Sequence, residues 1–371
     1  MPYSVVDLFC GVGGLSLSAA RADFDIALAV EFDKHAVAAH QKNFPGVKHL
    51  QSDISQLSGL TLLQQAGLAA NELDGLVGGP PCQGFSAIGR RNIDDERNSL
   101  FVKFFELVSE CRPRFFVVEN VPGILEDKYD DVRARAFEHI PADYTLLNPM
   151  KLRASDFGAP TTRERVFFVG YRSDDMEALT PTDFSAPNTI APVLVEEALC
   201  GLPLEICHEW QTEELSWRKL EQLPNSLFGR QVAGHIPDGV GDARAIQRYR
   251  DEQYVSGCFG TRHSVEVQAR YEGLRPGERD AISKSQRLKL DGFCPTLRAG
   301  TGPDKGSYQA VRPIHPTVGR VITPREAARL QGFPDWYQFA PSKWHSFRQI
   351  GNSVSPIVGE AVFRVIAAHL E

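Results

Sequence analysis

Short apolar runs separated by polar and small residues dominate the first 170 positions of the chain. The apolar runs are 5–9, 26–30, 76–77, 115–118 and 166–169. They are short enough for strands, and they are more apolar than strands that face water on one side. Helical patterns lie between them, the first through Leu15, Leu17, Ala19 and Ala20. Strands that alternate with helices predict an α/β fold with a doubly wound, mostly parallel sheet covered on both faces.

The regular pattern stops at about residue 173 and returns near residue 320. Prolines, glycines and charges between these points predict a second, smaller, loop-rich domain at 185–315, between a first domain at 1–184 and a closing segment at 316–371. A capped helix is expected at 323–330, because Thr323 can cap it, Pro324 suits its first position and Glu326 completes a capping box. A final amphipathic helix is expected at 356–370.

The charge distribution is more informative than the net charge of −7. Residues 173–243 carry a net charge of −10, whereas residues 244–320 carry +6. A local basic surface of this kind suits a polyanionic partner, although a solvated charged surface has the same composition. For the acidic half, the simplest prediction is an outward-facing helical insert.

Composition narrows the class of protein further. No apolar stretch is long enough to span a bilayer, and the N-terminus has no signal-peptide pattern. Seven cysteines without a repeated CxxC spacing suit reduced thiols in a cytoplasm better than disulfides. The candidate ligands for a zinc ion would be Cys200, Cys207, His208 and Cys258. Their spacing is irregular, and we expect no metal.

The segment 78–86 reads Gly-Gly-Pro-Pro-Cys-Gln-Gly-Phe-Ser and carries the strongest chemical signal. The proline pair fixes two φ angles and removes two backbone donors, so Cys82 follows a strand on a stiff turn. A cysteine presented in this way is typical of a nucleophile, whereas a buried cysteine that only fills space needs no such turn. The segment 83–100 after it is expected to be a mobile loop.

A glycine loop and two carboxylates predict a nucleotide-like cofactor. Gly11, Gly13 and Gly14 follow the first strand and open a helix, which lets a ligand approach the backbone. Ser16 stands where the dinucleotide fingerprint has its third glycine. Glu31 can accept hydrogen bonds from ribose hydroxyls and Asp53 from an adenine amino group. Each could be an ordinary surface carboxylate, but together they indicate an adenosine-type cofactor.

Charged side chains next to two further strands complete the candidate site, one after its strand and two before theirs. Glu119 ends an all-apolar strand, so burial should raise its pKa and favour proton donation. Arg163 and Arg165 alternate on an extended chain, so both point the same way and offer donors to a carbonyl, carboxylate or phosphate. A surface salt-bridge cluster is the alternative interpretation for the arginines.

In this order the motifs resemble those of cytosine-C5 DNA methyltransferases of the prokaryotic restriction-modification type, over nearly the whole chain. Segment 7–14 resembles the S-adenosylmethionine loop, 79–86 the nucleophile motif, 119–121 the motif of the cytosine-contacting glutamate and 163–165 the paired arginines. Segment 320–334 resembles the helix that supports the recognition domain, and 349–354 the return to the cofactor site. Thr161 departs from the family, which usually has glutamine there.

The resemblance implies a Rossmann-like methyltransferase with a target-recognition domain at 185–315. Its catalytic residues would be Cys82, Glu119, Arg163 and Arg165. S-adenosylmethionine would be held by Phe9, Gly11, Gly13, Gly14, Leu15, Glu31, Phe32, Asp53, Ile54, Pro80, Asn352, Ser353 and Val354. DNA would be contacted by Gln83, Ser86, Arg90, Arg91, Arg97, Arg262, Thr296 and Arg298. The partner would be double-stranded DNA with a short specific site, bound by a cytoplasmic monomer, with a separately encoded restriction endonuclease as a possible companion.

Three other functions fit part of the pattern. A transfer-RNA methyltransferase would use the same chemistry, but the Gly84-Phe85-Ser86 stretch and the long basic module favour DNA. A DNA-binding protein without activity would not need Cys82, Glu119 and Arg165 together. A nicotinamide dehydrogenase is disfavoured by Ser16.

Overall fold

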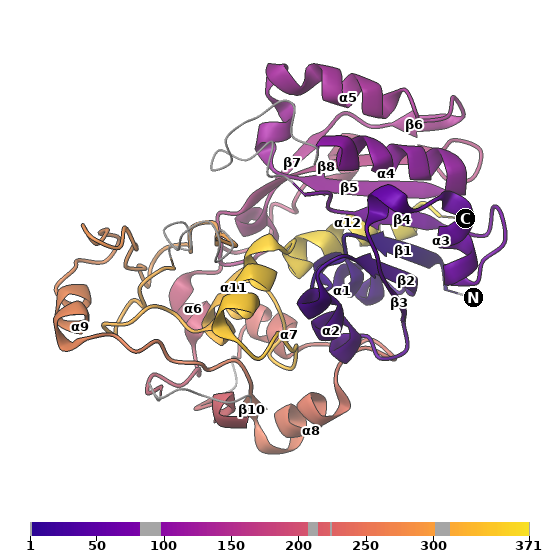
Figure 1. The fold of residues 1–371 in the computed structure, drawn as a ribbon. Coiled ribbons are helices and arrows are strands. Elements are labelled where there is room, and N and C mark those ends of the chain that lie inside the picture. The colour runs from indigo at the N-terminus through magenta and orange to yellow at the C-terminus, as the bar shows by residue number, and fades with distance from the viewer. Residues whose placement is uncertain (1, 82–97, 207–213, 223–224, 301–311, 371) are drawn as a thin grey trace.

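The computed structural model describes residues 2–81, 98–206, 214–222, 225–300 and 312–370. Among them an eight-stranded sheet runs in the order β3 (Lys48–Gln51), β2 (Asp25–Glu31), β1 (Ser4–Leu8), β4 (Gly75–Gly78), β5 (Phe115–Asn120), β8 (Glu164–Arg172) and β6 (Tyr144–Leu146), with β7 (Met150–Arg153) also paired to β8 (Figure 1). The strands from β3 to β5 are parallel, and β8 is antiparallel to β5. The five predicted strands and the α/β fold class are confirmed.

Helices cover both faces of the sheet. Successive side chains of β5 point to opposite faces of the sheet and belong to two apolar clusters, Val117 to the first and Val118 to the second. The first cluster includes residues of α1 (Gly14–Arg21), α2 (Lys34–Asn43) and α12 (Pro356–Ala368). The second includes residues of α3 (Gly59–Ala66), α4 (Asn98–Cys111) and α5 (Asp130–Phe137). Because both faces are buried, the strands are continuously apolar.

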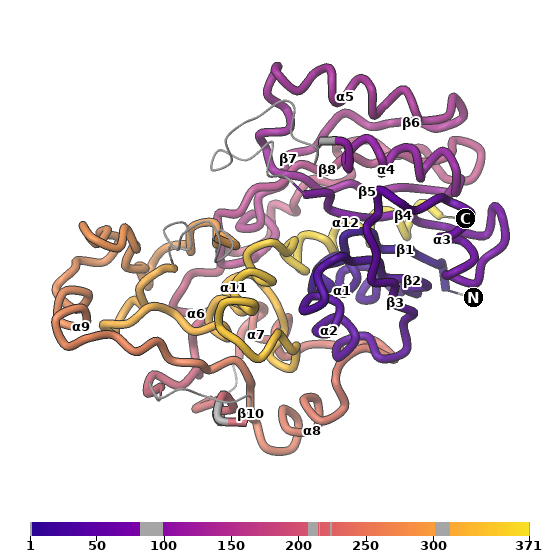
Figure 2. Tube along the Cα trace, viewed as in Figure 1, coloured from indigo at the N-terminus to yellow at the C-terminus, as the bar shows by residue number. Residues whose placement is uncertain are grey.

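The two ends of the described chain meet at one edge of the molecule. The last helix, α12, packs on the first, α1. Ser18 Oγ donates to Pro356 O at 3.3 Å, and Tyr3 Oη donates to Leu370 O at 3.1 Å. Figure 2 shows the yellow C-terminal segment lying against the indigo N-terminal segment. The predicted helix at 356–370 is therefore confirmed, and it closes one face of the sheet.

The chain between the sheet and its last helices extends away from the sheet in Figure 1. Its regular elements are α6 (Val195–Leu199), β9 (Arg218–Lys219), α7 (Leu227–Ala233), α8 (Ala243–Glu252), β10 (Tyr254–Val255) and α9 (Val265–Glu272). Single turns of 3-10 helix stand at Ile54–Gln56, Pro122–Leu125, Asp127–Tyr129, Ala154–Phe157, Pro181–Phe184 and Glu214–Ser216.

Two expectations about these connections were wrong. The acidic half is not an outward-facing helical insert: α6 and α7 are short, and Val195, Phe228 and Val232 are buried in the same apolar cluster as α1 and α12. Of the loop expected at 83–100, residues 83–97 lie outside the described residues, and the expectation is wrong for residues 98–100, which already belong to α4. A separate small cluster around Tyr271, Ile314 and Val321 holds α9 to the chain that returns from the second module.

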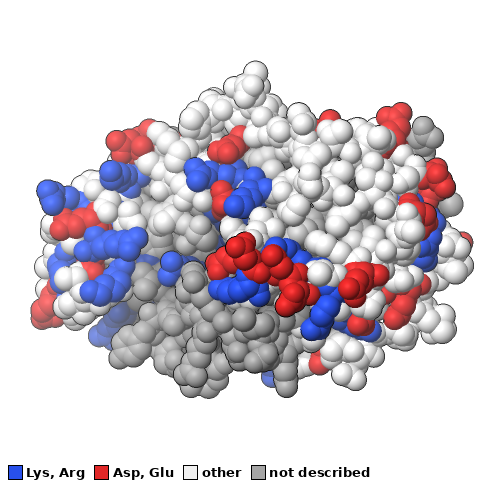
Figure 3. Space-filling view, turned by 90° about the horizontal axis from the view of Figure 1, so that it is seen from above, with Lys and Arg blue, Asp and Glu red and all other residues white. Residues whose placement is uncertain are grey.

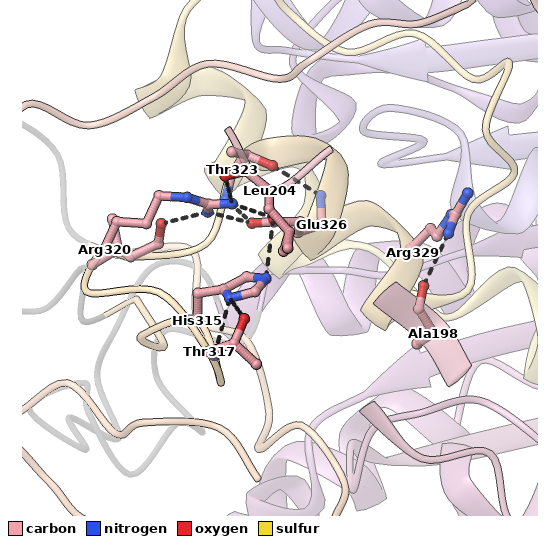
Figure 4. A network of polar contacts seen from close by, with 9 residues as sticks. Ala198, Leu204, His315, Thr317, Arg320, Thr323, Glu326 and Arg329 are labelled. Atoms are coloured by element: carbon pink, nitrogen blue, oxygen red, sulfur yellow. Dashed lines mark hydrogen bonds and ion pairs between the residues drawn. The ribbon is translucent and has the colours of Figure 1, made fainter. Parts of the chain in front are cut away.

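The helix α10 (Pro324–Gln331) has the predicted capping box. Thr323 N donates to Glu326 Oε2 at 2.7 Å, and Glu326 N donates to Thr323 Oγ1 at 3.2 Å. Arg320 binds both oxygens of Glu326, at 2.9 and 2.7 Å, and His315 Nε2 lies 3.6 Å from that carboxylate (Figure 4). Burial lowers the pKa of His315 to about 4, so the ring is neutral near pH 7. This buried network fixes the returning chain on α10.

Two features are absent from the described residues, a membrane-spanning helix and a metal-binding cluster. No helix there is long and apolar enough to cross a membrane. No group of three His, Cys, Asp or Glu in those ranges is arranged to hold a metal. Of the four residues considered for zinc, Cys207 and His208 lie outside the described residues, and burial raises the pKa of the Cys258 thiol to about 12.

Candidate active site and cofactor site

The loop between β1 and α1 is shaped by positive φ angles at Phe9 (58°), Gly11 (57°) and Gly13 (96°). A Cβ on Gly13 would lie 2.6 Å from both Phe44 and the Tyr337 hydroxyl, so this position admits only glycine. At Gly11 a Cβ would meet nothing closer than Phe9 O at 3.9 Å. The loop is therefore packed from behind at Gly13 and open at Gly11, as the approach of a ligand to the backbone requires.

Glu31 holds this loop in place at the end of β2. Its Oε2 accepts from Gly11 N at 3.0 Å, and its Oε1 accepts from Phe32 N at 2.8 Å and Asp33 N at 2.9 Å. Burial raises the pKa of the Glu31 carboxyl, although these three N–H groups act in the opposite direction. Phe32 beside it is 71% exposed, which leaves the face of its ring free for an aromatic ligand.

Two further predicted cofactor residues lie after β3. Asp53 is exposed and caps a 3-10 turn by accepting from Ser55 N at 2.9 Å, and Ile54 is buried below it. The Gly11 backbone, the exposed Phe32 ring and the exposed Asp53 carboxylate thus follow three adjacent strands of the sheet. This donor and acceptor set fits the adenosine part of S-adenosylmethionine.

The C-terminal segment returns to the same glycine loop. A Cβ on Gly14 would lie 2.8 Å from Val354 O and 3.2 Å from Ser353 Cβ, so the two chains touch at this point. Ser353 O accepts from Gln331 Nε2 at 2.9 Å, which ties the segment to α10. Asn352 is exposed at the end of α11 (Lys343–Asn352). The structure therefore brings the two ends of the predicted cofactor site together.

Sequence reasoning missed a buried polar chain behind the loop. Ser16 Oγ donates to Asp7 Oδ2 at 2.5 Å and lies 2.9 Å from His40 Nε2, and His40 Nδ1 lies 2.8 Å from His49 Nε2. Burial raises the pKa of Asp7 to about 7. The signal in the sequence is Ser16 itself, a hydroxyl at the position where the dinucleotide fingerprint has a glycine.

Glu119 and Arg165 meet at the carboxyl edge of the parallel strands. Glu119 is buried near the end of β5, and Arg165 Nε lies 2.7 Å from its Oε1. Arg165 reaches this edge because β8 is antiparallel, so that the beginning of β8 lies beside the end of β5. Burial raises the pKa of Glu119 against the opposing effect of Arg165 and then Arg163. The predicted direction of this shift is confirmed.

The turn that carries the candidate nucleophile begins beside Glu119. Asn120 Nδ2 donates to Pro80 O at 3.3 Å, and a Cβ on Gly79 would lie 3.1 Å from Glu119 Oε2. Pro81 is the last described residue of this turn. Six predicted residues lie outside the described residues: Cys82, Gln83, Ser86, Arg90, Arg91 and Arg97.

Arg163 makes different contacts from Arg165. It is buried, and its Nη1 donates to Leu297 O at 3.2 Å. Next to it, Thr162 N donates to Cys294 O at 3.0 Å, and Cys294 N donates to Pro160 O at 2.9 Å. Arg163 and Arg165 nevertheless line one small cavity, together with Val354. One arginine thus contacts Glu119 and the other anchors the segment around Leu297.

The basic residues of the second module differ in solvent exposure and in their contacts within the protein. Arg262 and Arg298 are exposed, and Thr296 is half-buried. By contrast, Arg270 pairs with Asp280 at 2.6 Å, and Arg287 donates to the carbonyls of Tyr271, Glu272, Leu274 and Pro316. Figure 3 shows basic side chains gathered at the end of the molecule that carries α9.

The sheet order, the open glycine loop and the carboxylates at the ends of β2 and β5 define a Rossmann-like methyltransferase that uses S-adenosylmethionine. A family model described as C-5 cytosine-specific DNA methylase matches residues 3–368, and the chain belongs to that family. The protein is therefore a DNA cytosine-5 methyltransferase. The dehydrogenase alternative is wrong, and DNA is the substrate that the description of the family names.

Relatives match the chain nearly end to end. Type II methyltransferase M.XorII of Xanthomonas oryzae pv. oryzae is 36% identical, covering 96% of this chain and 82% of the relative. Type II methyltransferase M.DdeI of Desulfomicrobium norvegicum is 32% identical, covering 99% and 89%. An Escherichia coli prophage protein described as a DNA modification methyltransferase has a crystal structure with 48% identity, 98% coverage of both chains and a TM-score of 0.88. The S. pombe Dnmt2 methyltransferase, with 17% identity, coverage of 97% and 96% and a TM-score of 0.57, shares the fold.

Proposed function

We propose that the protein methylates C5 of a cytosine that is flipped out of duplex DNA, through a covalent bond between Cys82 and C6. The observation that carries this proposal is the buried Glu119–Arg165 pair, with 2.7 Å between Arg165 Nε and Glu119 Oε1, set against the backbone of Gly79. Glu119 is an acid next to a cationic donor, and it packs against Gly79, which precedes Cys82 by three positions. This arrangement matches the needs of a pyrimidine ring at N3, O2 and C6.

Residues from both ends of the chain would hold the cofactor. Glu31 and Asp53 would accept hydrogen bonds from the ribose and the adenine, Phe32 would stack on the adenine ring, and the backbone at Gly11 would lie beside the ligand. The remaining contacts would come from Phe9, Gly13, Gly14, Leu15, Ile54, Pro80, Asn352, Ser353 and Val354. Bound S-adenosylmethionine supplies an electrophilic methyl group on a sulfonium sulfur, which the activated C5 takes.

Cys82 makes C5 reactive. C5 of cytosine is a weak nucleophile, and addition of the Cys82 thiolate to C6 turns C5 into the carbon of an enamine. The bond between C6 and the cysteine sulfur must break again after methyl transfer. It breaks when a base takes the proton from C5 and the electron pair reforms the C5–C6 double bond, so that the thiolate leaves.

Glu119 and Arg165 handle the charge that this addition creates. The raised pKa of Glu119 favours the protonated acid, which donates to N3 during the addition and takes the proton back during the elimination. Arg165 is placed to hold the O2 carbonyl. Arg163 supports this edge by fixing the segment around Leu297.

A base stacked in a duplex cannot present C6 to a thiolate, so the target cytosine must leave the stack. We propose that residues 185–315 recognise the site, with Arg262, Thr296 and Arg298 on the DNA. From the catalytic domain, Gln83, Ser86, Arg90, Arg91 and Arg97 would contact it. The name Type II methyltransferase of the relatives supports a role in a restriction-modification system, with a separate endonuclease. We further propose a cytoplasmic enzyme that acts as a monomer.

Expression in a host without cytosine methylation, followed by bisulfite sequencing, tests the reaction. Protected cytosines confined to one short motif are expected, and full conversion of all DNA from cells with folded protein would contradict the proposal. A duplex with 5-fluorocytosine at that site tests the covalent step, because fluorine at C5 leaves no proton to remove. A protein–DNA adduct of wild type but not of Cys82→Ser is expected on a denaturing gel. Turnover by Cys82→Ser would overturn the covalent mechanism.

A further inference from the structure

Residues 294–299, here called the strap, run between the candidate base site and the candidate cofactor site. On one side Cys294 exchanges two backbone hydrogen bonds with residues 160 and 162, and Leu297 O accepts from Arg163. On the other side the strap touches Gly351 of α11, where a Cβ would lie 2.6 Å from both Ala299 N and the carbonyl carbon of Arg298. The side chain of Leu297 is buried in the main apolar cluster between these contacts.

The three atoms nearest to a Cβ on Gly351 all belong to the backbone of the strap. A side chain at this position would meet the N, Cα and C atoms of the strap rather than the flexible end of a side chain, so either the strap or the end of α11 would have to move. Alanine is a better helix former than glycine, and Gly351 has no positive φ. Close packing on the strap is therefore the physical reason for glycine here.

The contacts continue from Gly351 to the glycine loop. Asn352 ends α11, and Val354 O lies where a Cβ on Gly14 would meet it at 2.8 Å. Val354 also lines the small cavity shared by Arg163 and Arg165. A displacement of the strap would thus reach the loop that faces the cofactor on one side and the arginine pair on the other.

The strap also carries two of the residues that are proposed above to contact DNA. Arg298 is exposed and Thr296 is half-buried, and both lie between the anchors at Cys294 and Ala299. A duplex that contacts them would bias the position of the strap, and the cofactor would bias the position of residues 352–354. Two ligands that favour the same arrangement of one packed element strengthen each other's binding.

We propose that Gly351 is a positioning residue that couples DNA recognition to cofactor binding through the strap. The proposal rests on the cofactor-site assignment given above. It predicts that duplex DNA containing the methylated motif tightens the binding of S-adenosylhomocysteine, a ligand that cannot react. The ratio of the affinity with DNA to the affinity without DNA, here called the factor, should fall in the roughly 5- to 150-fold range of coupled sites. By reciprocity the ligand should tighten DNA binding by the same factor.

Titration calorimetry with S-adenosylhomocysteine, with and without the duplex, measures this factor. The factor is the ratio of the two affinities, so it is defined whatever the affinity without DNA becomes in a variant. In Gly351→Ala the factor should fall towards one. Gly46→Ala is the matched control, because a Cβ there meets nothing within 4 Å, and it should keep the wild-type factor. A factor of one in wild type, or an unchanged factor in Gly351→Ala, would overturn the proposal.

Two more variants separate the possible failures. Pro295→Ala relaxes the strap without removing a backbone donor, so it should fold and should lower the factor even if Gly351→Ala does not fold. An unchanged factor in Pro295→Ala would then decide against the proposal. Asn352→Ala tests the site assignment itself, since it should weaken S-adenosylhomocysteine binding in the absence of DNA. If it does not, the assignment fails independently of the coupling.

Discussion

Arg329 and Asp335 form an ion pair in which neither side chain is exposed to solvent. Arg329 Nε lies 2.8 Å from Asp335 Oδ1, and Nη2 lies 2.7 Å from Oδ2. Arg329 Nη1 also donates to Ala198 O at 3.2 Å and to Cys200 O at 2.6 Å, of which the first is drawn in Figure 4. One guanidinium thus joins α10, the turn that follows it and the end of α6.

Asp335→Ala should destabilise the protein by about 3–5 kcal/mol, because it leaves the Arg329 charge buried without its counter-ion. Urea unfolding followed by circular dichroism measures the change. Arg275→Ala, which breaks an exposed pair with Glu278, is the control and should unfold with wild-type stability. Equal stability of wild type and Asp335→Ala would show that Arg329 does not depend on this carboxylate.

Glu119→Gln should lower the methylation rate by roughly 100-fold or more, because the amide has the shape of the acid but donates no acidic proton. The wild-type rate should fall as pH rises through the raised pKa of Glu119, since the acid form disappears, and the variant should lack this alkaline decline. Glu164→Gln, one residue before Arg165, is the control and should keep the wild-type profile. Identical pH profiles of Glu119→Gln and wild type would assign the proton donor elsewhere.

Asp7→Asn should change how stability depends on pH. The folded pKa of Asp7 is about 7, above its ordinary value of 3.8, so between these values the native state holds a proton that the unfolded chain has lost. The free energy of unfolding of wild type therefore falls as pH rises across this window, by on the order of 4 kcal/mol from this group, relative to the asparagine variant. Denaturant titrations at pH 4 and pH 8 test this, and a constant difference between the two proteins would refute it.

Two arginines of the second module should affect DNA binding in different ways. Arg298→Ala should reduce the dependence of affinity on salt by about one released counter-ion, because an exposed arginine is free to contact phosphate. Arg287→Ala should loosen the module by freeing four carbonyls, and should weaken binding with little change in that slope. Filter binding at several salt concentrations distinguishes these outcomes. If only Arg287→Ala reduced the dependence of DNA affinity on salt, Arg287 would be the phosphate contact and Arg298 would not.

Thr161→Val should keep activity and raise stability by about 1 kcal/mol. The Thr161 hydroxyl is buried and finds no hydrogen-bond partner among the described residues, and an unpaired buried hydroxyl carries a desolvation cost. Valine keeps the branched shape at the bridge to Cys294. A thermal melt and a methylation assay are sufficient, and a marked loss of activity would show that this hydroxyl takes over a role of the glutamine usual in the family.

The sheet was predictable because its strands are buried on both faces and appear as apolar runs. β6 and β7 were missed, since they have only three and four residues and β7 buries every second one. α8 was also missed, although Asp242 caps it, because few apolar residues mark its buried side. The pattern of apolar residues along the sequence identifies helices and strands that are buried along their whole length. It does not identify elements that are short or half-exposed.

That Glu119 and Arg165 belong to one site could be expected from the family resemblance, although their strands bring them together only because β8 is antiparallel and Arg165 lies at its beginning. The partner of Arg163 could not, since Leu297 lies 134 positions further along the chain. The packing of Gly351 could not be expected either: its motif indicated the cofactor site, and only the strap that crosses it explains the glycine. Motifs identified which residues matter, whereas contacts between distant segments determine how they are arranged.

The packing of α12 on α1 has a consequence for biosynthesis. Residues near the two ends of the described chain must meet before one face of the sheet is covered, and such distant contacts form slowly. During translation the apolar side of β1, β4 and β5 would stay partly uncovered until α12 has left the ribosome. The nascent chain is then a natural client for chaperones, and a circular permutant that places α12 directly before β1 should depend on them less.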